Sequence, residues 1–183
     1  DYLIVSQRSH FDSEGEYLTF GAKESLDVLD WVNIVRKIYA PDIPIILHGV
    51  SMGAATVLIT AGIYENLVDE NNKPNIICCI ADSAYDDIIS QIAYLLGKRS
   101  SITKSAVIGL FKVNMRLRAK AKASDASPIE AVTNIKIPAM FIHGKEDLYV
   151  LPENSIRLYE ACNSDIKELV LIEGAGHACS YVA

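Results

Sequence analysis

A serine between two glycines is the first group in this chain that could do chemistry. Residues 49–53 read Gly-Val-Ser-Met-Gly, with Ser51 at the centre. The apolar run at 43–48 is typical of a buried strand, and the run that begins at Ala54 is typical of a helix. A Gly-x-Ser-x-Gly turn between a strand and a helix presents the serine hydroxyl as a nucleophile. This context separates Ser51 from a serine in an ordinary strand-to-helix turn and makes it a candidate nucleophile.

A serine hydroxyl needs a base to take its proton, and that base needs an acid to orient it. Asp147 follows an apolar strand predicted at 139–143, and His177 follows the next predicted strand at 167–173. Because parallel strands end at the same edge of a sheet, Ser51, Asp147 and His177 are expected to meet there. The three residue types in this order indicate a nucleophile, an acid and a base.

Other residues compete for two of these roles. Glu146 could be the acid in place of its neighbour Asp147, and Asp82 is the stronger rival because it also ends an apolar strand. The other histidines are weaker candidates for the base, since two of them precede glycines at strand ends and are expected to be structural. They are His10, His48 and His143.

Length and composition limit the class of protein. The chain has 183 residues, of which 50% are hydrophobic and 22% charged, and this suits one domain with a sizeable core. No apolar run approaches the roughly 18 residues that a membrane span needs. The formal net charge of −6 argues against a nucleic-acid partner.

The four cysteines do not indicate a disulfide framework or a metal site. Cys78 and Cys79 are adjacent in a predicted strand, so they point to opposite faces and cannot bridge to each other without distortion. Cys162 and Cys179 stand apart, and no Cys/His cluster has zinc spacing. Free thiols in a reducing compartment are expected, which favours a cytoplasmic location. No metal or organic cofactor is implied.

Apolar runs alternate with helical patterns along the chain. The predicted strands lie at 2–5, 43–48, 76–81, 139–143 and 167–173, and the predicted helices at 22–39, 54 to about 66, 86–96, 102–123 and 152–162. A polar loop is predicted at 69–74. Continuous apolar strands that alternate with helices predict an α/β fold, with a mostly parallel sheet and helices on both faces.

Residues 84–127 interrupt the alternation with two helices and no strand, and we expect them to be a helical lid inserted into a single domain, 1–183. The second of these helices combines basic with apolar residues. It could form a basic lid that favours acidic or amphipathic substrates, although a solvated face over a packed one is the favoured interpretation. Three of its apolar residues either line an acyl pocket or belong to the core: Leu110, Phe111 and Met115.

These motifs resemble the α/β-hydrolase superfamily, and within it the bacterial serine hydrolases of the prolyl-oligopeptidase-like branch. The likeness covers nearly the whole chain. It rests on the serine turn, the strand that leads to Asp147 and the Gly-Ala-Gly-His loop that ends at His177. Two further segments match family patterns, although the first has Ser6 and Asp12 where the family has Asp and Gly: they are residues 6–15 and 21–30.

The resemblance implies a serine hydrolase that cleaves carboxylic esters or related acyl bonds of a small-molecule acyl substrate, through an acyl-enzyme on Ser51. His177 would be the base, Asp147 the acid and the backbone N–H of Met52 one donor to the oxyanion. A peptidase or amidase of the same fold is the alternative. A binding module without catalytic activity is a second class of function.

The resemblance also implies that the chain begins at the fourth strand of the fold and stops after the histidine. The strand at 2–5 would then lie beside a gap, and the loop that usually supplies the second oxyanion donor would lie upstream. We therefore expect the sequence to be part of a longer protein, poorly stable or inactive as a fragment.

Overall fold

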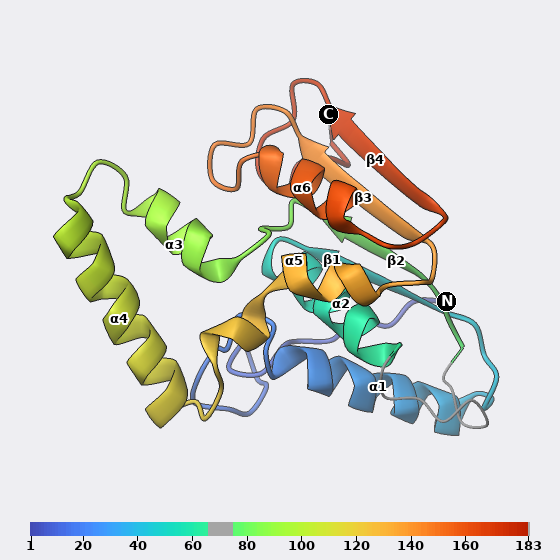
Figure 1. Ribbon diagram of the computed structural model, residues 1–183. Coiled ribbons are helices and arrows are strands. Elements are labelled where there is room, and N and C mark those ends of the chain that lie inside the picture. Colours follow the sequence, from blue (N-terminus) through green and yellow to red (C-terminus); the bar gives the residue numbers. More distant parts are fainter. Residues whose placement is uncertain (66–74, 183) are drawn as a thin grey trace.

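One parallel sheet organises the chain. The computed structural model describes residues 1–65 and 75–182 (Figure 1). Its four described strands pair in the order β1-β2-β3-β4, and every pair is parallel. They are β1 (Ile45–Val50), β2 (Ile76–Asp82), β3 (Ala139–Gly144) and β4 (Lys167–Ile172). Their carboxyl ends therefore share one edge of the sheet, where candidate site residues were predicted to meet.

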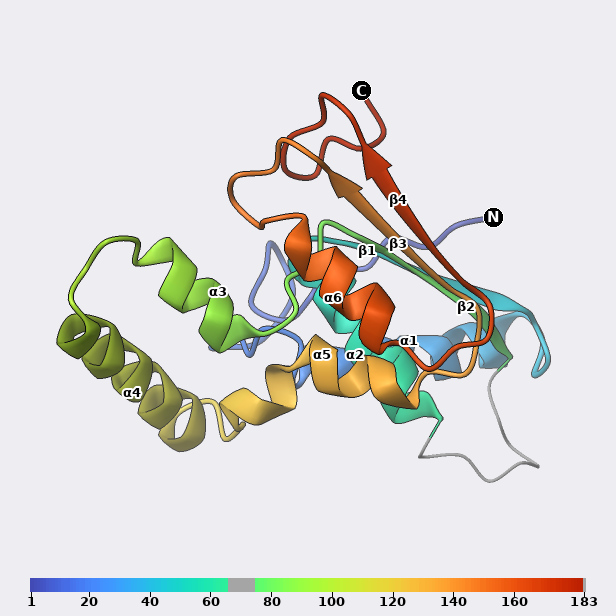
Figure 2. The same ribbon diagram turned by 45° about the horizontal axis from the view of Figure 1, so that its top comes forward.

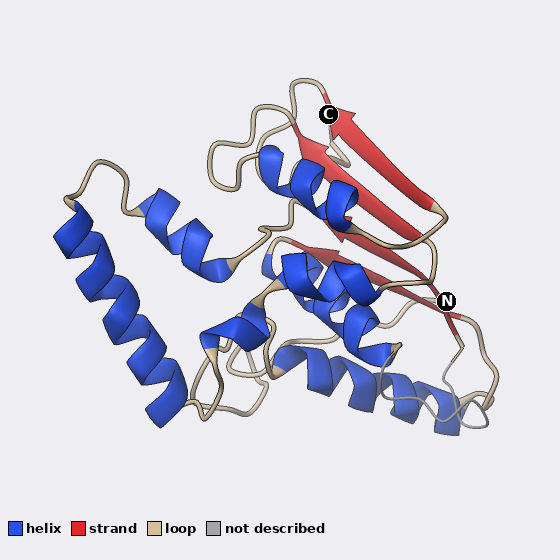
Figure 3. Ribbon diagram, in the orientation of Figure 1, coloured by secondary structure: helices blue, strands red, loops and turns tan. Residues whose placement is uncertain are grey.

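Helices connect these strands, and Figure 3 separates the two kinds of element by colour. The described helices are α1 (Glu24–Ile38), α2 (Met52–Tyr64), α3 (Ile88–Leu95), α4 (Ser101–Leu117), α5 (Pro128–Ala131) and α6 (Glu153–Ala161), with the short helices η2 (Ala123–Ala126) and η3 (Val132–Asn134). The predicted α/β fold with a parallel sheet and flanking helices is confirmed. Within the described part of the chain, no helix has both the length and the apolar character of a membrane span.

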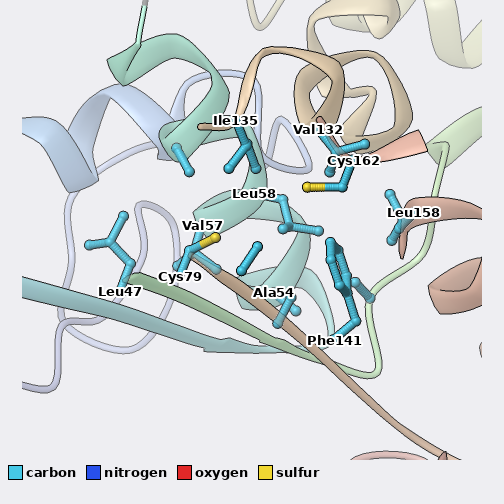
Figure 4. Close-up of a cluster of buried hydrophobic side chains, with 14 of the residues drawn as sticks. Leu47, Ala54, Val57, Leu58, Cys79, Val132, Ile135, Phe141, Leu158 and Cys162 are labelled. Carbon is cyan, nitrogen blue, oxygen red and sulfur yellow. The ribbon is translucent and has the colours of Figure 1, made fainter. Parts of the chain in front are cut away.

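The core lies between α2 and one face of the sheet. Leu58 of α2 and Phe141 of β3 are fully buried, and Cys79 of β2 lies between them and Leu47 of β1 (Figure 4). Each large side chain buried here contributes roughly 1.5–3 kcal/mol relative to exposure. α2 is apolar nearly all round because it is enclosed, with α5 so close that a Cβ at Gly62 would lie 2.4 Å from the Ala131 carbonyl oxygen. This packing seats α2 against the sheet, and Ala54 and Ala55 near its start are fully buried.

Burial also determines the state of the thiols. All four cysteines are free, Cys79 and Cys162 are buried, and Cys179 is exposed. Burial raises the pKa of the Cys79 and Cys162 thiols, so both stay protonated and unreactive.

The predicted strand at 2–5 is wrong. These residues form no regular structure, and Tyr2 and Ile4 are almost fully exposed. A strand is stable only when a neighbour pairs with its N–H and C=O groups. Among the described residues, β1 pairs with β2 alone, and no strand pairs with residues 2–5. The loop predicted at 69–74 and the predicted helix end at 66 lie outside the described residues.

Two helices extend away from the sheet. α3 and α4, which belong to the segment predicted as a lid, lie beside the α/β core in both orientations (Figures 1 and 2). A second buried cluster joins them to the core: Met115 of α4 and Ile88 of α3 pack near Ala55 and Val150. Phe111 of α4 meets Phe20 with ring centroids 5.5 Å apart. This cluster adjoins the carboxyl edge of the sheet.

Candidate active site

The turn from β1 to α2 holds Ser51 in a conformation that few residues adopt. Ser51 has φ 55° and ψ −117°, in the region that ordinarily favours glycine. Its backbone N–H donates to the Asp82 carbonyl oxygen at 2.8 Å, so the turn is fastened to the end of β2. Strain of this kind persists where the surroundings over-determine it, and it projects the hydroxyl from the sheet edge.

The two glycines around Ser51 have different roles. A Cβ at Gly49 would lie 2.1 Å from the Gly53 carbonyl oxygen, whereas a Cβ at Gly53 would have no neighbour within 4 Å. Only Gly49 is required by close approach of the backbone.

We therefore expect opposite effects of alanine at these positions. Gly49→Ala should prevent the turn from closing and destabilise the protein by several kcal/mol, since backbone atoms would have to move. Gly53→Ala, in the first turn of α2, should be neutral or stabilise by up to about 1 kcal/mol through helix propensity. Urea unfolding of both variants measures the difference, and equal losses would contradict the assignment.

His177 lies between Ser51 and Asp147. Its Nε2 is 2.9 Å from Ser51 Oγ, and its Nδ1 is 2.6 Å from Asp147 Oδ2. With the proton on Nδ1, the ring donates to the carboxylate and accepts from the serine hydroxyl. The fold thus brings together three groups from the ends of β1, β3 and β4, in the arrangement that serine activation needs.

The loop after β3 prepares Asp147 as an acceptor. The carboxylate is buried, and its Oδ1 accepts from the backbone N–H groups of Tyr149 and Val150, both at 2.9 Å. Gly144 allows this loop to approach the histidine loop, since a Cβ there would lie 2.3 Å from the Ala175 carbonyl oxygen. With Oδ1 occupied, Oδ2 is the oxygen that faces His177.

His143 is a buried structural neighbour of this acid. Its Nε2 lies 2.8 Å from the Val150 carbonyl oxygen and 3.2 Å from Asp147 Oδ2, so it carries the proton. Its Nδ1 then accepts from the Ser155 hydroxyl at 2.7 Å. The interpretation of His143 as structural fits these contacts. Its link to Asp147 was not foreseen, although the spacing of four residues was a usable signal.

The rival acids lie elsewhere. Asp82 accepts from the Ser83 hydroxyl at 2.9 Å and from the Ser180 hydroxyl, and the Ser83 hydroxyl in turn accepts from the Ala178 N–H. Asp82 therefore tethers the segment after His177 rather than the imidazole itself. Glu146 is exposed. Of the weaker histidines, His10 contacts the Arg8 carbonyl oxygen and His48 is exposed on β1.

α3 supports the acid loop from the side of the predicted lid. The buried Gln91 amide donates to the Tyr149 carbonyl oxygen, and the Tyr94 hydroxyl donates to the Leu148 carbonyl oxygen, both at 2.7 Å. The Tyr149 ring lies 5.0 Å from the His177 ring, centroid to centroid. Sequence reasoning missed these contacts, because the two hydrogen bonds join residues more than fifty positions apart and the ring contact joins two different loops.

Met52 is the first residue of α2, so its N–H has no acceptor within the helix and adds to the positive end of the helix dipole.

Of the three predicted pocket residues, Met115 is buried, Phe111 is half-buried and Leu110 is exposed. No group of three or more His, Cys, Asp or Glu residues is placed to hold a metal ion in the described part of the chain.

The two N-terminal segments that match family patterns form a support beside α2. Arg8 and Asp27 form an ion pair that raises the Arg8 pKa through its hydrogen bond with Asp27, although burial opposes the rise. Glu24, buried at the start of α1, accepts from the Gly21 N–H at 2.9 Å and from the N–H and hydroxyl of Thr19. These residues have structural partners and lie outside the chain of contacts at Ser51.

A parallel sheet with a strained serine turn, and with acid and histidine loops at one edge, defines the α/β-hydrolase fold. A family model described as serine aminopeptidase, S33, matches residues 98–180, which include Asp147 and His177. An uncharacterized protein of Bacillus subtilis, YqkD, is 29% identical over 179 residues, which are 98% of this chain and 56% of that protein. The chain therefore has the α/β-hydrolase fold, and its residues 98–180 are similar to the serine aminopeptidase family.

Solved structures share the fold. An esterase of Pyrococcus furiosus aligns with a TM-score of 0.62 at 23% identity, over 93% of this chain and 60% of that one. An acylaminoacyl peptidase of Pyrococcus horikoshii aligns with a TM-score of 0.60 at 16% identity, over 92% and 27%. A monoacylglycerol lipase of Paleococcus ferrophilus gives 0.52 at 17% identity, over 90% and 70%. The chain spans little more than half the length of the curated relative and of the esterase.

Proposed function

We propose that this chain carries the catalytic groups of a serine hydrolase that cleaves carboxylic esters or related acyl bonds of small molecules. The observation that carries the proposal is the continuous hydrogen-bonded chain from Ser51 Oγ through His177 to Asp147. A binding module has no need for this arrangement, and the strained conformation of Ser51 adds a cost that a catalytic role explains.

In the proposed mechanism, Ser51 Oγ attacks the acyl carbonyl carbon as His177 Nε2 takes the hydroxyl proton. Asp147 holds the Nδ1–H tautomer and stabilises the imidazolium. The Met52 N–H donates to the oxyanion of the tetrahedral intermediate. The bond between the acyl carbon and the alcohol oxygen then breaks as His177 gives its proton to that oxygen. The alcohol departs, and the acyl group remains bound to Ser51 as an acyl-enzyme. Water, activated by the same imidazole, attacks this ester and releases the acid and the free serine.

A peptidase or amidase is the second candidate, because the matching family model is described as a serine aminopeptidase and one structural neighbour is an acylaminoacyl peptidase. The same groups would serve, with His177 protonating an amine. The two candidates differ in the leaving group alone.

We further propose that residues 84–127 act as the lid. We also propose that the protein is cytoplasmic, since four free cysteines suit a reducing compartment.

Fluorophosphonate labelling of the full-length protein, followed by peptide mapping, tests the proposal. We expect label on the peptide that contains Ser51, and its loss in Ser51→Ala and in His177→Ala, because the reagent requires an activated serine. Ser105→Ala, on the exposed surface of α4, is the matched control and should label normally. A folded protein that does not label would favour the binding module.

A further inference from the structure

Basic charge is concentrated in one segment of an acidic chain. Residues 98–122 hold eight of the 17 basic residues and no Asp or Glu, although the formal net charge is −6. Within residues 1–65 and 75–182, none of the eight forms an ion pair with a carboxylate. They are Lys98, Arg99, Lys104, Lys112, Arg116, Arg118, Lys120 and Lys122. The segment is therefore a cationic surface without internal compensation.

The same segment exposes a row of apolar side chains on α4. Intervals of four, four, three and four residues place five of them along one face of the helix. The row, here called the α4 stripe, consists of Ile102, Ala106, Leu110, Val113 and Leu117. Ala106 is exposed, and the four larger side chains are 81%, 64%, 51% and 72% exposed in chain order.

The α4 stripe is distinct from the face that anchors the helix. Phe111 and Met115 make the contacts with the core, on the side of α4 away from the stripe. Figures 1 and 2 place α4 at the outer edge of the molecule, away from the sheet. Lys112 and Arg116 run along one side of the stripe. An exposed apolar row bordered by uncompensated basic residues is the pattern of a helix that lies in a membrane interface.

We propose that α4 docks the protein onto the surface of an anionic lipid bilayer. The α4 stripe enters the acyl boundary, and the basic residues of 98–122 meet the phosphate headgroups. Charge complementarity favours this occupant. A second copy of the chain would oppose two cationic segments, and a nucleic acid would meet the basic residues but leave the stripe in water. Docking needs no chemistry at Ser51, so it can fail or hold independently of the proposed function.

Sedimentation of the full-length protein with vesicles tests the proposal. We expect binding to vesicles that contain phosphatidylglycerol, weaker binding to pure phosphatidylcholine, and loss of the difference at high salt. Leu110→Ser with Leu117→Ser should weaken binding at least about tenfold, because two apolar side chains no longer insert. Lys112→Gln with Arg116→Gln should weaken it about fivefold for each charge removed.

Matched variants separate docking from general surface effects. Ile38→Ser, at the exposed end of α1, and Lys145→Gln, on an exposed loop, should bind vesicles like the wild type, as should Ser51→Ala. The substituted side chains, apart from that of Ser51, lie outside the hydrogen-bonded chain from Ser51 to Asp147, and thermal melting checks that each variant is folded. Unchanged binding by the Leu110/Leu117 variant would overturn the proposal. So would a dimer that this variant dissociates, or tighter binding to single-stranded RNA than to vesicles.

Discussion

Replacing Ser51 with alanine is expected to reduce ester turnover by roughly 10⁴–10⁶-fold, which is the effect of removing the nucleophile from comparable hydrolases. The reason is geometric: Ser51 Oγ lies 2.9 Å from His177 Nε2, and among the described residues it is the hydroxyl that is placed to give its proton to this nitrogen. Steady-state kinetics with a small chromogenic ester, on the full-length protein, measure the loss.

A double variant tests whether Ser51 and His177 act as one catalytic unit. Groups that act as one unit lose activity together, so the double variant Ser51→Ala/His177→Ala should be no less active than Ser51→Ala alone. Ser105→Ala is again the control. Retention of more than about one percent of turnover by Ser51→Ala would point to another nucleophile.

Replacing Asp147 with asparagine should have the second largest effect, a loss of about 10⁴-fold in kcat. The backbone N–H groups of Tyr149 and Val150 hold the Oδ1 side of this group, so the asparagine oxygen should stay there. Its NH₂ would then face His177 Nδ1 and favour the tautomer protonated at Nε2. That tautomer cannot accept the proton of Ser51.

Asp82→Asn is the matched control, because Asp82 was the rival acid. Its carboxylate contacts two hydroxyls, those of Ser83 and Ser180, and a hydroxyl can rotate to donate or accept. We expect kcat within about tenfold of the wild type for this variant, a loss no larger than a loosened loop produces. Full turnover in Asp147→Asn together with loss in Asp82→Asn would reverse the assignment. Thermal melting should confirm that both variants fold.

The sequence determined the features that depend on short-range patterns. Apolar runs at 43–48, 76–81, 139–143 and 167–173 predicted the four observed strands to within two residues at each end. Because these runs alternate with helical patterns, the sequence predicted a parallel sheet, and the carboxyl ends of parallel strands lie at one edge. The proximity of Ser51, Asp147 and His177 followed from these facts, since all three residues come directly after, or shortly after, a strand.

Other features depend on tertiary neighbours that short-range sequence patterns do not reveal. The strand predicted at 2–5 failed because a strand needs a neighbour, and local β propensity cannot supply one. Gly53 fits the motif as well as Gly49 does, yet only the space around each position reveals that Gly49 alone is required. The outward orientation of the α4 stripe likewise depends on which face of α4 the core covers.

The choice between Asp147 and Asp82 shows the division most clearly. Both residues are buried acids at or near the end of a parallel strand, so composition and position along the chain treat them alike. The loops decide between them: the approach at Gly144 brings Asp147 to His177, and the hydroxyls of Ser83 and Ser180 engage Asp82. Hydrogen bonds are directional and short, so the partner of a carboxylate is set by tertiary packing and not by the local sequence.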